Sequence, residues 1–279
     1  KKVWDNFILH DARNGNFLFY RDYMEYHAAR FKDNSLLFFD EKDILIAIIP
    51  ANKKRKTYIT HEGLTYGGLI YKKNLGTEKI LIIFNHIVKY LKESNFATIM
   101  YKRMPYVYTL YPSEEDLYAL YCIGFNISRR DVSSCMNIAR YSIKGKKLNE
   151  YKRGKKNGLS LIKTSDSSKI FSIINKNLNK KYNVLSTHTS DEMNYLHFKF
   201  PNNIEMFELL EGSKVVGGII IYLNIGIVHV QYVACLEYAK KLRGIDFLII
   251  SIIKKYKDNY EWFDYGISTE MDGMLLNNS

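Results

Sequence analysis

The chain has 279 residues, 47% of them hydrophobic, which is enough apolar material for two cores and excludes a disordered protein. Its 41 Lys and Arg against 29 Asp and Glu give a formal net charge of +12. That charge suits an anionic partner such as coenzyme A, a nucleotide sugar, tRNA or an acidic membrane face, although solvated surface charge explains the same excess.

The three cysteines stand far apart and form no Cys-x-x-Cys pair or Cys/His cluster, so we expect no metal site and a reducing, cytoplasmic compartment. No run of about 18 apolar residues predicts a transmembrane helix, and residues 1–4 do not open a signal peptide. Because the sequence lacks an initiator Met and stops without a clear terminus, we expect it to be trimmed at both ends. It contains no Walker loop, Rossmann fingerprint or nucleophile elbow.

Residues 1–143 are expected to form one domain. Apolar residues at every third or fourth position predict the helix at 78–94, and short apolar runs between polar turns predict strands. We expect helices at residues 20–32, 78–94 and 113–120, and strands at residues 35–39, 44–50, 97–101 and 129–139. Ser113 followed by three acids is typical of a helix start, because the acids face the positive end of the helix dipole.

Residues 144–279 are expected to form a second domain with a similar order of elements. Its first residues, 144–156, are dense in Lys and Arg, and we interpret them as the junction, more as a solvated linker than as a phosphate- or tRNA-binding segment. We expect strands at 159–163, 206–211, 215–222, 227–234 and 262–267, and helices at 167–179, 191–199, 238–257 and from 274 onward. The helix before the last strand implies parallel pairing there, hence a mixed α/β (α+β) fold.

The order of elements over residues 206–268 resembles the acyl-donor half of a GNAT-type acyltransferase domain. Two such domains joined by a basic segment resemble the FemAB family. The likeness rests on residues 151–159 (YKRGKKNGL), 237–244 (EYAKKLRG) and 262–268 (WFDYGIS). It implies two tandem GNAT-like domains, the second without its final strands in this sequence.

Three segments of the first domain are similar to a bacterial GNAT-like group found with surface-polysaccharide genes. They are residues 61–68 (HEGLTYGG), 102–108 (KRMPYVY) and 114–120 (EEDLYAL). This likeness implies an acceptor that belongs to the cell surface.

GNAT enzymes hold the pyrophosphate of acyl-coenzyme A in a glycine-containing cradle at the start of the long helix. The resemblance therefore implies acyl-CoA (acetyl-CoA) as donor. Its implied contacts are Val233, Ala234, Lys241, Arg243 and Gly244. Asp246 departs from the pattern, because a carboxylate stands where a small residue is expected. Either the cradle has degenerated, or Asp246 points away and nearby basic residues supply the charge.

Acyl transfer to an amine needs an aligned donor, a base and stabilisation of developing charge. We expect His229 as base, Tyr232 as acid and Asp264 as a group that orients an amine. Strand alternation places His229 and Gln231 on one face and Tyr232 on the other. Glu115 is a fourth candidate. The alternatives are an ordinary sheet-face histidine, a structural salt bridge at Asp264 and a helix-capping role for Glu115.

The candidate acceptor contacts are Tyr66, Gly67, Lys102, Tyr108, Asp116 and Arg130. Paired glycines, Gly67 and Gly68, permit positive φ angles and close approach by a ligand. A bulged strand, an aromatic strand face and a surface ion pair are the alternatives for these positions.

Together these patterns predict an N-acyltransferase that moves an acyl group, from acyl-CoA, to the amine of a sugar or nucleotide-linked precursor of a cell-surface polymer. Two alternatives stay open: an aminoacyl-tRNA-dependent FemAB-type peptidoglycan enzyme, and a non-catalytic binding module with a decayed donor site. None of them requires DNA or a metal. The sequence does not indicate the oligomeric state.

Overall fold

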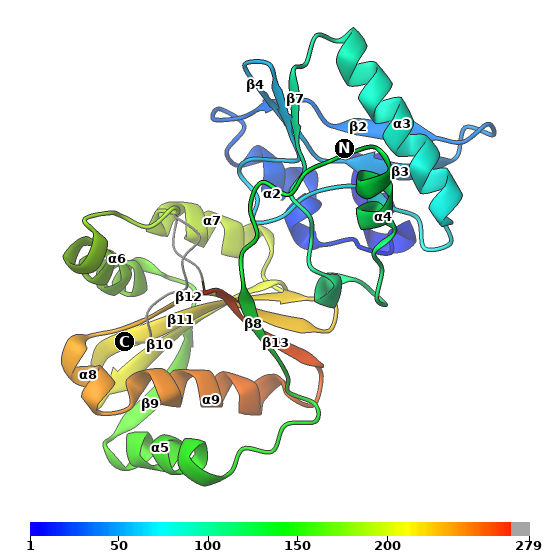
Figure 1. The fold of residues 1–279 in the computed structure, drawn as a ribbon. Coiled ribbons are helices and arrows are strands. Elements are labelled where there is room, and N and C mark those ends of the chain that lie inside the picture. Colours follow the sequence, from blue (N-terminus) through cyan, green and yellow to red (C-terminus); the bar gives the residue numbers. More distant parts are fainter. Residues whose placement is uncertain (269–279) are drawn as a thin grey trace. The chain divides into compact units, whose positions relative to one another are not determined.

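The computed structural model describes residues 1–268 (Figure 1). The chain separates into two compact units, Lys1–Ser128 (unit 1) and Arg129–Ser279 (unit 2). The division falls earlier than residue 143, because the strand at Ser133–Asn137 pairs with a strand of unit 2. The helix expected from residue 274 lies outside the described residues.

Unit 1 contains two small sheets and one long amphipathic helix. Its helices are α1 (Lys2–Asn6), α2 (Arg21–Glu25), α3 (Thr77–Glu93) and α4 (Glu115–Cys122), with short η1 (Phe7–Asp11), η2 (Phe17–Phe19) and η3 (Tyr106–Tyr108). Its strands are β1 (Lys32–Asp33), β2 (Leu36–Phe39), β3 (Leu45–Ile49), β4 (Asn52–Lys54), β5 (Thr57–Ile59), β6 (Ile70–Tyr71) and β7 (Thr98–Met100). The sheets have the orders β1-β4-β5-β7 and β2-β3-β6.

The core of unit 1 lies between α3 and the two sheets. Ile80, Ile83, Phe84, Ile87 and Leu91 of α3 are buried, which is the spacing of one helix face. They pack in one cluster with side chains of β3, β5 and β6. The helix expected at residues 20–32 is much shorter than predicted, because only Arg21–Glu25 is α-helical and turns follow it.

Unit 2 is built on one six-stranded mixed sheet with the order β8-β13-β12-β11-β10-β9. The strands are β8 (Ser133–Asn137), β9 (Leu159–Thr164), β10 (Ile204–Glu211), β11 (Lys214–Asn224), β12 (Ile227–Cys235) and β13 (Trp262–Ile267). The helices are α5 (Gly145–Lys156), α6 (Ser168–Tyr182), α7 (Ser190–Lys199), α8 (Glu237–Lys241) and α9 (Gly244–Tyr256). Every neighbouring pair is antiparallel except β12 and β13, which are parallel as predicted.

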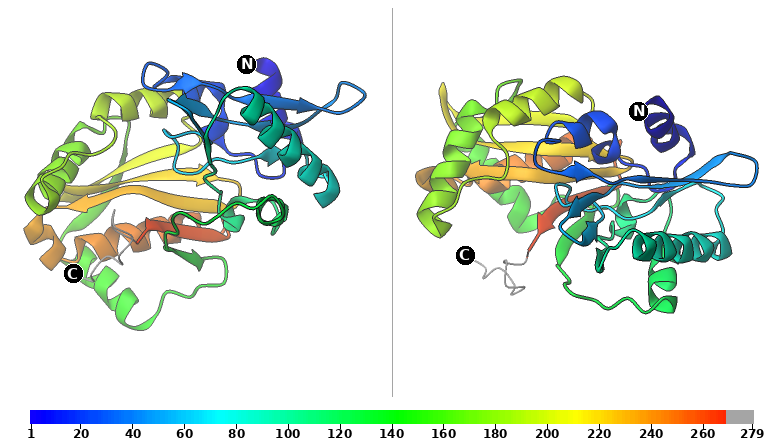
Figure 2. Two further views of the ribbon diagram at one scale, coloured as in Figure 1. Left: turned by 45° about the horizontal axis from the view of Figure 1, so that its top comes forward. Right: turned by 90° about the horizontal axis from the view of Figure 1, so that it is seen from above.

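Helices cover both faces of this sheet. Figure 1 shows α6 and α7 on one side and α9 with α5 on the other, and Figure 2 shows the same layers from two further directions. Val228 and Val230 of β12 belong to the core that contains α9. Because successive side chains of a strand alternate, Ile227 and His229 face α6 and α7 instead.

Two expectations for unit 2 were wrong. Residues 144–156 are not a solvated linker: they form α5, whose Tyr151 ring stacks on Phe247 of α9 at 5.1 Å between ring centroids. The helix expected at 238–257 is broken between α8 and α9, where Arg243 takes a left-handed conformation with φ of +71°. Among the described residues, no helix has both the length and the hydrophobicity needed to cross a bilayer.

Candidate active site

The parallel pairing of strands β12 and β13 is short. They pair in parallel only over Ile227–His229 and Trp262–Asp264, after which each strand departs from regular pairing. On β12, Gln231 has no partner in the register with β11, since Val230 pairs with Ile221 and Tyr232 with Ile220. This β-bulge directly follows the end of the parallel pairing, and Gly266 of β13 still lies near β12, since a Cβ there would be 3.5 Å from the Val230 carbonyl oxygen.

His229 and Asp264 form a close pair at the end of the parallel pairing. His229 Nδ1 lies 2.9 Å from Asp264 Oδ2, and the two residues are each other's last partners in the parallel register. The Asp264 side chain is 7% exposed and that of His229 is 14% exposed. Asp264 Oδ1 also accepts from the Ser133 hydroxyl (2.5 Å) and from the backbone N–H of Gly266 (2.9 Å).

Tyr232 lies on the same face of β12 as His229, which corrects the expectation from simple alternation. Without a bulge, alternation would point Tyr232 to the α9 face. The extra residue at Gln231 shifts the alternation by one, so Tyr232 points to the α6/α7 face. There the Tyr232 ring meets Phe171 of α6 edge to face at 5.3 Å. Its hydroxyl lies 2.7 Å from Nδ1 of His188, and burial raises the pKa of the Tyr232 hydroxyl.

The start of α9, where the cofactor contacts were expected, is filled by the chain itself. A Cβ on Gly244 would lie 2.9 Å from the Ala239 carbonyl oxygen and 3.0 Å from Cys235 Sγ. Gly244 therefore allows α9 to pack closely against β12 and α8. Ala234 is buried and Val233 is exposed on β12, while Lys241 is exposed on α8.

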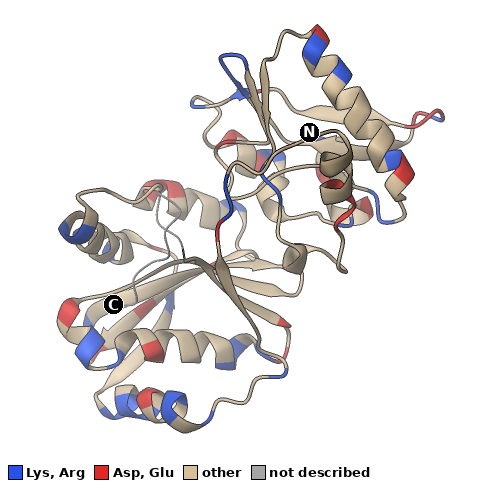
Figure 3. Ribbon diagram, in the orientation of Figure 1, with Lys and Arg blue, Asp and Glu red and all other residues tan. Residues whose placement is uncertain are grey.

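Helix α5 neutralises the charges at the start of α9. Lys147 Nζ donates to Asp246 Oδ1 at 2.8 Å, so Asp246 does point to a basic partner. Glu150 Oε2 lies 2.6 Å from Arg243 Nε, as an ion pair whose N–H is not aligned for a hydrogen bond. Figure 3 shows how densely Lys and Arg occur on α5. Arg243, expected to contact the cofactor, and Lys147 are thus each paired with a carboxylate of this chain.

In unit 1, Lys102 holds the loop at residues 61–64. Its ammonium donates to the carbonyl oxygens of His61 (3.2 Å), Glu62 (3.4 Å) and Leu64. Burial lowers the pKa of Lys102 to about 8. The side chain is thus occupied by backbone acceptors.

The paired glycines let the chain pack against itself. A Cβ on Gly67 would lie 2.0 Å from the Thr60 carbonyl oxygen. Gly68 has a φ of +94°, and its position lets the Tyr101 hydroxyl accept from the Leu69 N–H at 2.8 Å. These glycines therefore serve close packing of the chain against itself.

The two candidate carboxylates of α4 belong to separate polar contacts of unit 1. Asp116 accepts from the Tyr101 hydroxyl (3.0 Å) and lies 3.5 Å from Arg103 Nε; burial raises its pKa and Arg103 opposes the shift. Glu115 lies 2.5 Å from Arg13 NH1. Against the effect of burial, hydrogen bonds from Ser113 and Arg13 lower the pKa of Glu115.

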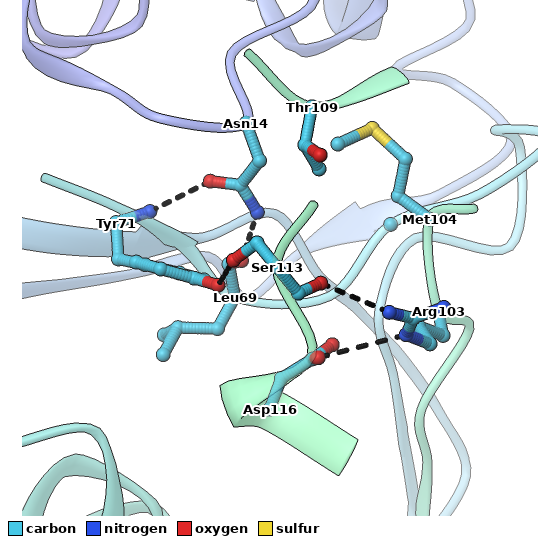
Figure 4. Close-up of a pocket in the computed structure, with 9 residues that line it drawn as sticks. Asn14, Leu69, Tyr71, Arg103, Met104, Thr109, Ser113 and Asp116 are labelled. Atoms are coloured by element: carbon cyan, nitrogen blue, oxygen red, sulfur yellow. Dashed lines mark hydrogen bonds and ion pairs between the residues drawn. The ribbon is translucent and has the colours of Figure 1, made fainter. Parts of the chain in front are cut away.

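A small polar cavity lies beside these groups (Figure 4). It is lined by Asn14, Gly67, Leu69, Tyr71, Arg103, Met104, Thr109, Ser113 and Asp116. Its volume of about 10 Å³ is close to the minimum of about 10–15 Å³ that one water needs. A sugar or nucleotide is much larger than this space.

The structure thus gathers the predicted residues into two groups. Tyr66, Gly67, Lys102, Tyr108 and Asp116 come from neighbouring segments of unit 1, and the Tyr66 and Tyr108 rings lie 4.8 Å apart. Glu115 also belongs to unit 1, whereas Arg130 belongs to unit 2 together with His229, Tyr232 and Asp264.

Sequence reasoning missed Ser133, His188 and Arg13, which bond to three of the predicted catalytic residues. Ser133 and His188 are isolated polar residues, and their partners lie 131 and 44 positions away, so no local pattern marks them. No group of three or more His, Cys, Asp or Glu side chains suited to a metal ion occurs within residues 1–268.

No family model matches the chain, and no curated protein matches it. Solved structures do resemble it. FemX has a TM-score of 0.67 at 9% identity, covering 95% of this chain and 86% of that one. The C-terminal domain of a putative lysylphosphatidylglycerol synthetase from Agrobacterium fabrum has a TM-score of 0.61 at 13% identity, covering 96% and 78%. L-PGS from Bacillus licheniformis has a TM-score of 0.57 at 12% identity, covering 89% and 78%.

At these identities the likeness shows the fold alone. The prediction of a mixed α/β fold with tandem GNAT-like domains is confirmed. The chain thus has a tandem GNAT-like fold.

Proposed function

We propose that this protein transfers an aminoacyl group from an activated ester, as in aminoacyl-tRNA, to an amine. The observation that carries the proposal is the His229–Asp264 pair at the end of the parallel pairing of β12 and β13. A buried carboxylate that binds one ring nitrogen sets the tautomer and the orientation of the imidazole, as it does for a histidine that acts as a general base. The pair also disfavours the non-catalytic alternative.

The choice of donor follows from the start of α9. Gly244 is packed by its own chain, and the basic side chains of Arg243 and Lys147 are already paired with Glu150 and Asp246, which leaves less charge for the pyrophosphate of coenzyme A. The proposed chemistry therefore uses an ester donor in place of coenzyme A. The net charge of +12 suits tRNA, whose phosphates bind basic proteins with a steep salt dependence.

The proposed chemistry uses the α6/α7 face of β12. With Nδ1–H donated to Asp264, His229 carries its lone pair on Nε2 and accepts the proton of the attacking amine. The amine nitrogen bonds to the ester carbonyl carbon, and the carbon–oxygen bond to the carrier then breaks. Tyr232 gives its proton to the departing oxygen, and its raised pKa keeps it protonated at neutral pH.

Spacing on the strand supports these two roles. His229 and Tyr232 share one face and are separated along β12 by one regular residue and one bulged residue. Side chains two regular positions apart on a strand are roughly 7 Å from each other. That separation leaves room for a reacting carbonyl between an acid and a base.

The acceptor is proposed only as a class, an amine of a small or nucleotide-linked molecule. In unit 1, two of the residues expected to contact it, Gly67 and Asp116, line a cavity of about 10 Å³. A third, Lys102, already donates to three carbonyls. The cell-surface precursor and the binding of the acceptor at Tyr66, Tyr108 or Arg130 stay predictions.

The test compares two donors. Thermal unfolding is followed with aminoacyl-tRNA and with acetyl-CoA, and loss of a labelled aminoacyl group from tRNA is measured with a panel of amines. We expect stabilisation and amine-dependent transfer with aminoacyl-tRNA only. His229→Gln should lower transfer by about 10²–10⁴-fold, the usual contribution of a general base. His86→Gln, at an exposed position of α3, is the matched control.

Two outcomes contradict the proposal. Stabilisation and turnover with acetyl-CoA alone would favour the acyl-CoA alternative. No response to either donor would favour a binding module.

A further inference from the structure

Edge strand β8 contributes a side chain to the candidate site. Ser133 is the first residue of β8, and its hydroxyl lies 2.5 Å from Asp264 Oδ1 and 2.9 Å from the Gly266 carbonyl oxygen. A hydroxyl has one proton, and the shorter contact to a carboxylate is the stronger hydrogen bond. Ser133 therefore donates to Asp264 on the oxygen opposite to the one that faces His229.

A second bulge explains why Ser133 reaches this position. From the Asp264–Cys135 pair to the Ile267–Ser133 pair, β13 advances by three residues and β8 by only two. Gly266 in this bulge has a φ of +87°, a conformation that favours glycine. Its N–H turns toward Asp264 Oδ1 and its carbonyl oxygen toward the Ser133 hydroxyl.

We propose that Ser133 is a positioning residue for His229, acting through Asp264; this inference rests on the proposed function. Two donors, the Ser133 hydroxyl and the Gly266 N–H, hold Oδ1, so the carboxylate cannot rotate and Oδ2 stays directed at His229 Nδ1. A fixed carboxylate sets the tautomer and the orientation of the imidazole, and loss of such support typically lowers activity by about 10–100-fold.

The test uses variants at two adjacent serines. Ser133→Ala removes the hydroxyl, Ser133→Thr keeps it on a side chain suited to a strand, and Ser134→Ala alters the next exposed residue of β8. The first readout is the ¹H NMR signal of the hydrogen-bonded Nδ1–H of His229, assigned by its absence in His229→Gln. The second is the rate of aminoacyl transfer. The melting temperature of each variant shows that it is folded.

We expect Ser133→Ala to broaden or abolish the Nδ1–H signal and to lower kcat by about 10–100-fold with little change in KM. Ser133→Thr should restore both, and Ser134→Ala should change neither. A purely structural serine would change the melting temperature without these effects.

Different results would overturn the role of Ser133 and the proposed function. If Ser133→Ala leaves the Nδ1–H signal and kcat intact while the native protein transfers aminoacyl groups, the role of Ser133 is overturned and the proposed function stands. If the native protein transfers nothing but its Nδ1–H signal depends on Ser133, the positioning is supported and the proposed function is overturned.

Discussion

Glu150 Oε2 lies 2.6 Å from Nε of Arg243, the left-handed residue that precedes α9. The Glu150 side chain is 10% exposed and that of Arg243 is 39% exposed. The pair thus joins α5 to the break between α8 and α9, and removal of Glu150 leaves the partly exposed guanidinium of Arg243 without this partner.

From this pair we predict that Glu150→Gln lowers the free energy of unfolding by about 1–2 kcal/mol. Breaking a fully buried pair costs about 3–5 kcal/mol, and partial exposure of Arg243 reduces that figure through solvent screening. Glu237→Gln is the matched control, because its pair with Lys240 is exposed on both sides and should contribute less than about 1 kcal/mol. Urea unfolding measures both. Equal costs for the two variants would show that α5 does not depend on Glu150.

A second prediction concerns acid stability and the buried pair His27 and His61 of unit 1. Their ring centroids lie 5.4 Å apart, and each residue is 3% exposed. Burial lowers the pKa of His27 to about 4, assisted by Arg30, and lowers that of His61 to about 3. Lys102 and Arg21 act in the same direction on His61, whereas Asp33 opposes them.

Because both folded pKa values lie below the ordinary value near 6.5, the unfolded chain binds more protons as the pH falls. Stability is therefore retained above pH about 6.5 and declines as the pH falls, with each histidine contributing up to about 1.4 kcal/mol per pH unit. His27→Leu should flatten this decline between pH about 6.5 and 4, while His86→Leu on the surface of α3 should not. Urea midpoints measured across this range test it, and an unchanged slope in His27→Leu would contradict it.

A third prediction concerns the glycine pair of unit 1. Gly67→Ala would place a methyl carbon 2.0 Å from the Thr60 carbonyl oxygen, which is backbone and cannot move alone. We expect a loss of at least about 2 kcal/mol in the free energy of unfolding. Gly76→Ala, at the N-cap of α3 with no atom within 4 Å of the added carbon, should cost less than about 1 kcal/mol. Similar losses at both positions would mean that the Thr60 contact relaxes.

The periodic features of the sequence predicted most of the fold. The strand at Trp262–Ile267 has the predicted bounds, and α3 lies within one residue of its prediction. In α3 the buried side chains repeat at the spacing of one helix face. Both bulges were missed. The extra residue at Gln231 and the bulge at Gly266 are defined by the strand opposite, and a single strand's pattern does not contain that register.

For the candidate site, the sequence indicated residues but not the contacts between them. His229 and Asp264 were identified from residue type and position on two strands, yet their contact depends on the parallel pairing of β12 with β13. Ser133 and His188 could not be predicted, since tertiary packing alone brings them to their partners. Asp246 was recognised as a departure from the GNAT pattern, but its partner Lys147 was assigned to a linker.

The last prediction separates the proposed acid from the base. Tyr232→Phe keeps the ring against Phe171 but removes the hydroxyl that lies 2.7 Å from His188 Nδ1. If Tyr232 protonates the departing oxygen, kcat should fall by about 10²-fold or more while KM changes little, because the hydroxyl acts in the transition state. Tyr195→Phe on the exposed surface of α7 is the matched control and should leave kcat unchanged.

Donors with different leaving groups test the role of Tyr232 as the acid more directly. A donor ester whose alcohol is more acidic needs less help from an acid, so the deficit of Tyr232→Phe should shrink with such a donor. The deficit of His229→Gln should persist, since the base acts on the attacking amine. Parallel rates with a good and a poor leaving group measure this difference. If the Tyr232→Phe deficit is the same for both donors, Tyr232 supports His188 and the packing of α6 and is not the acid.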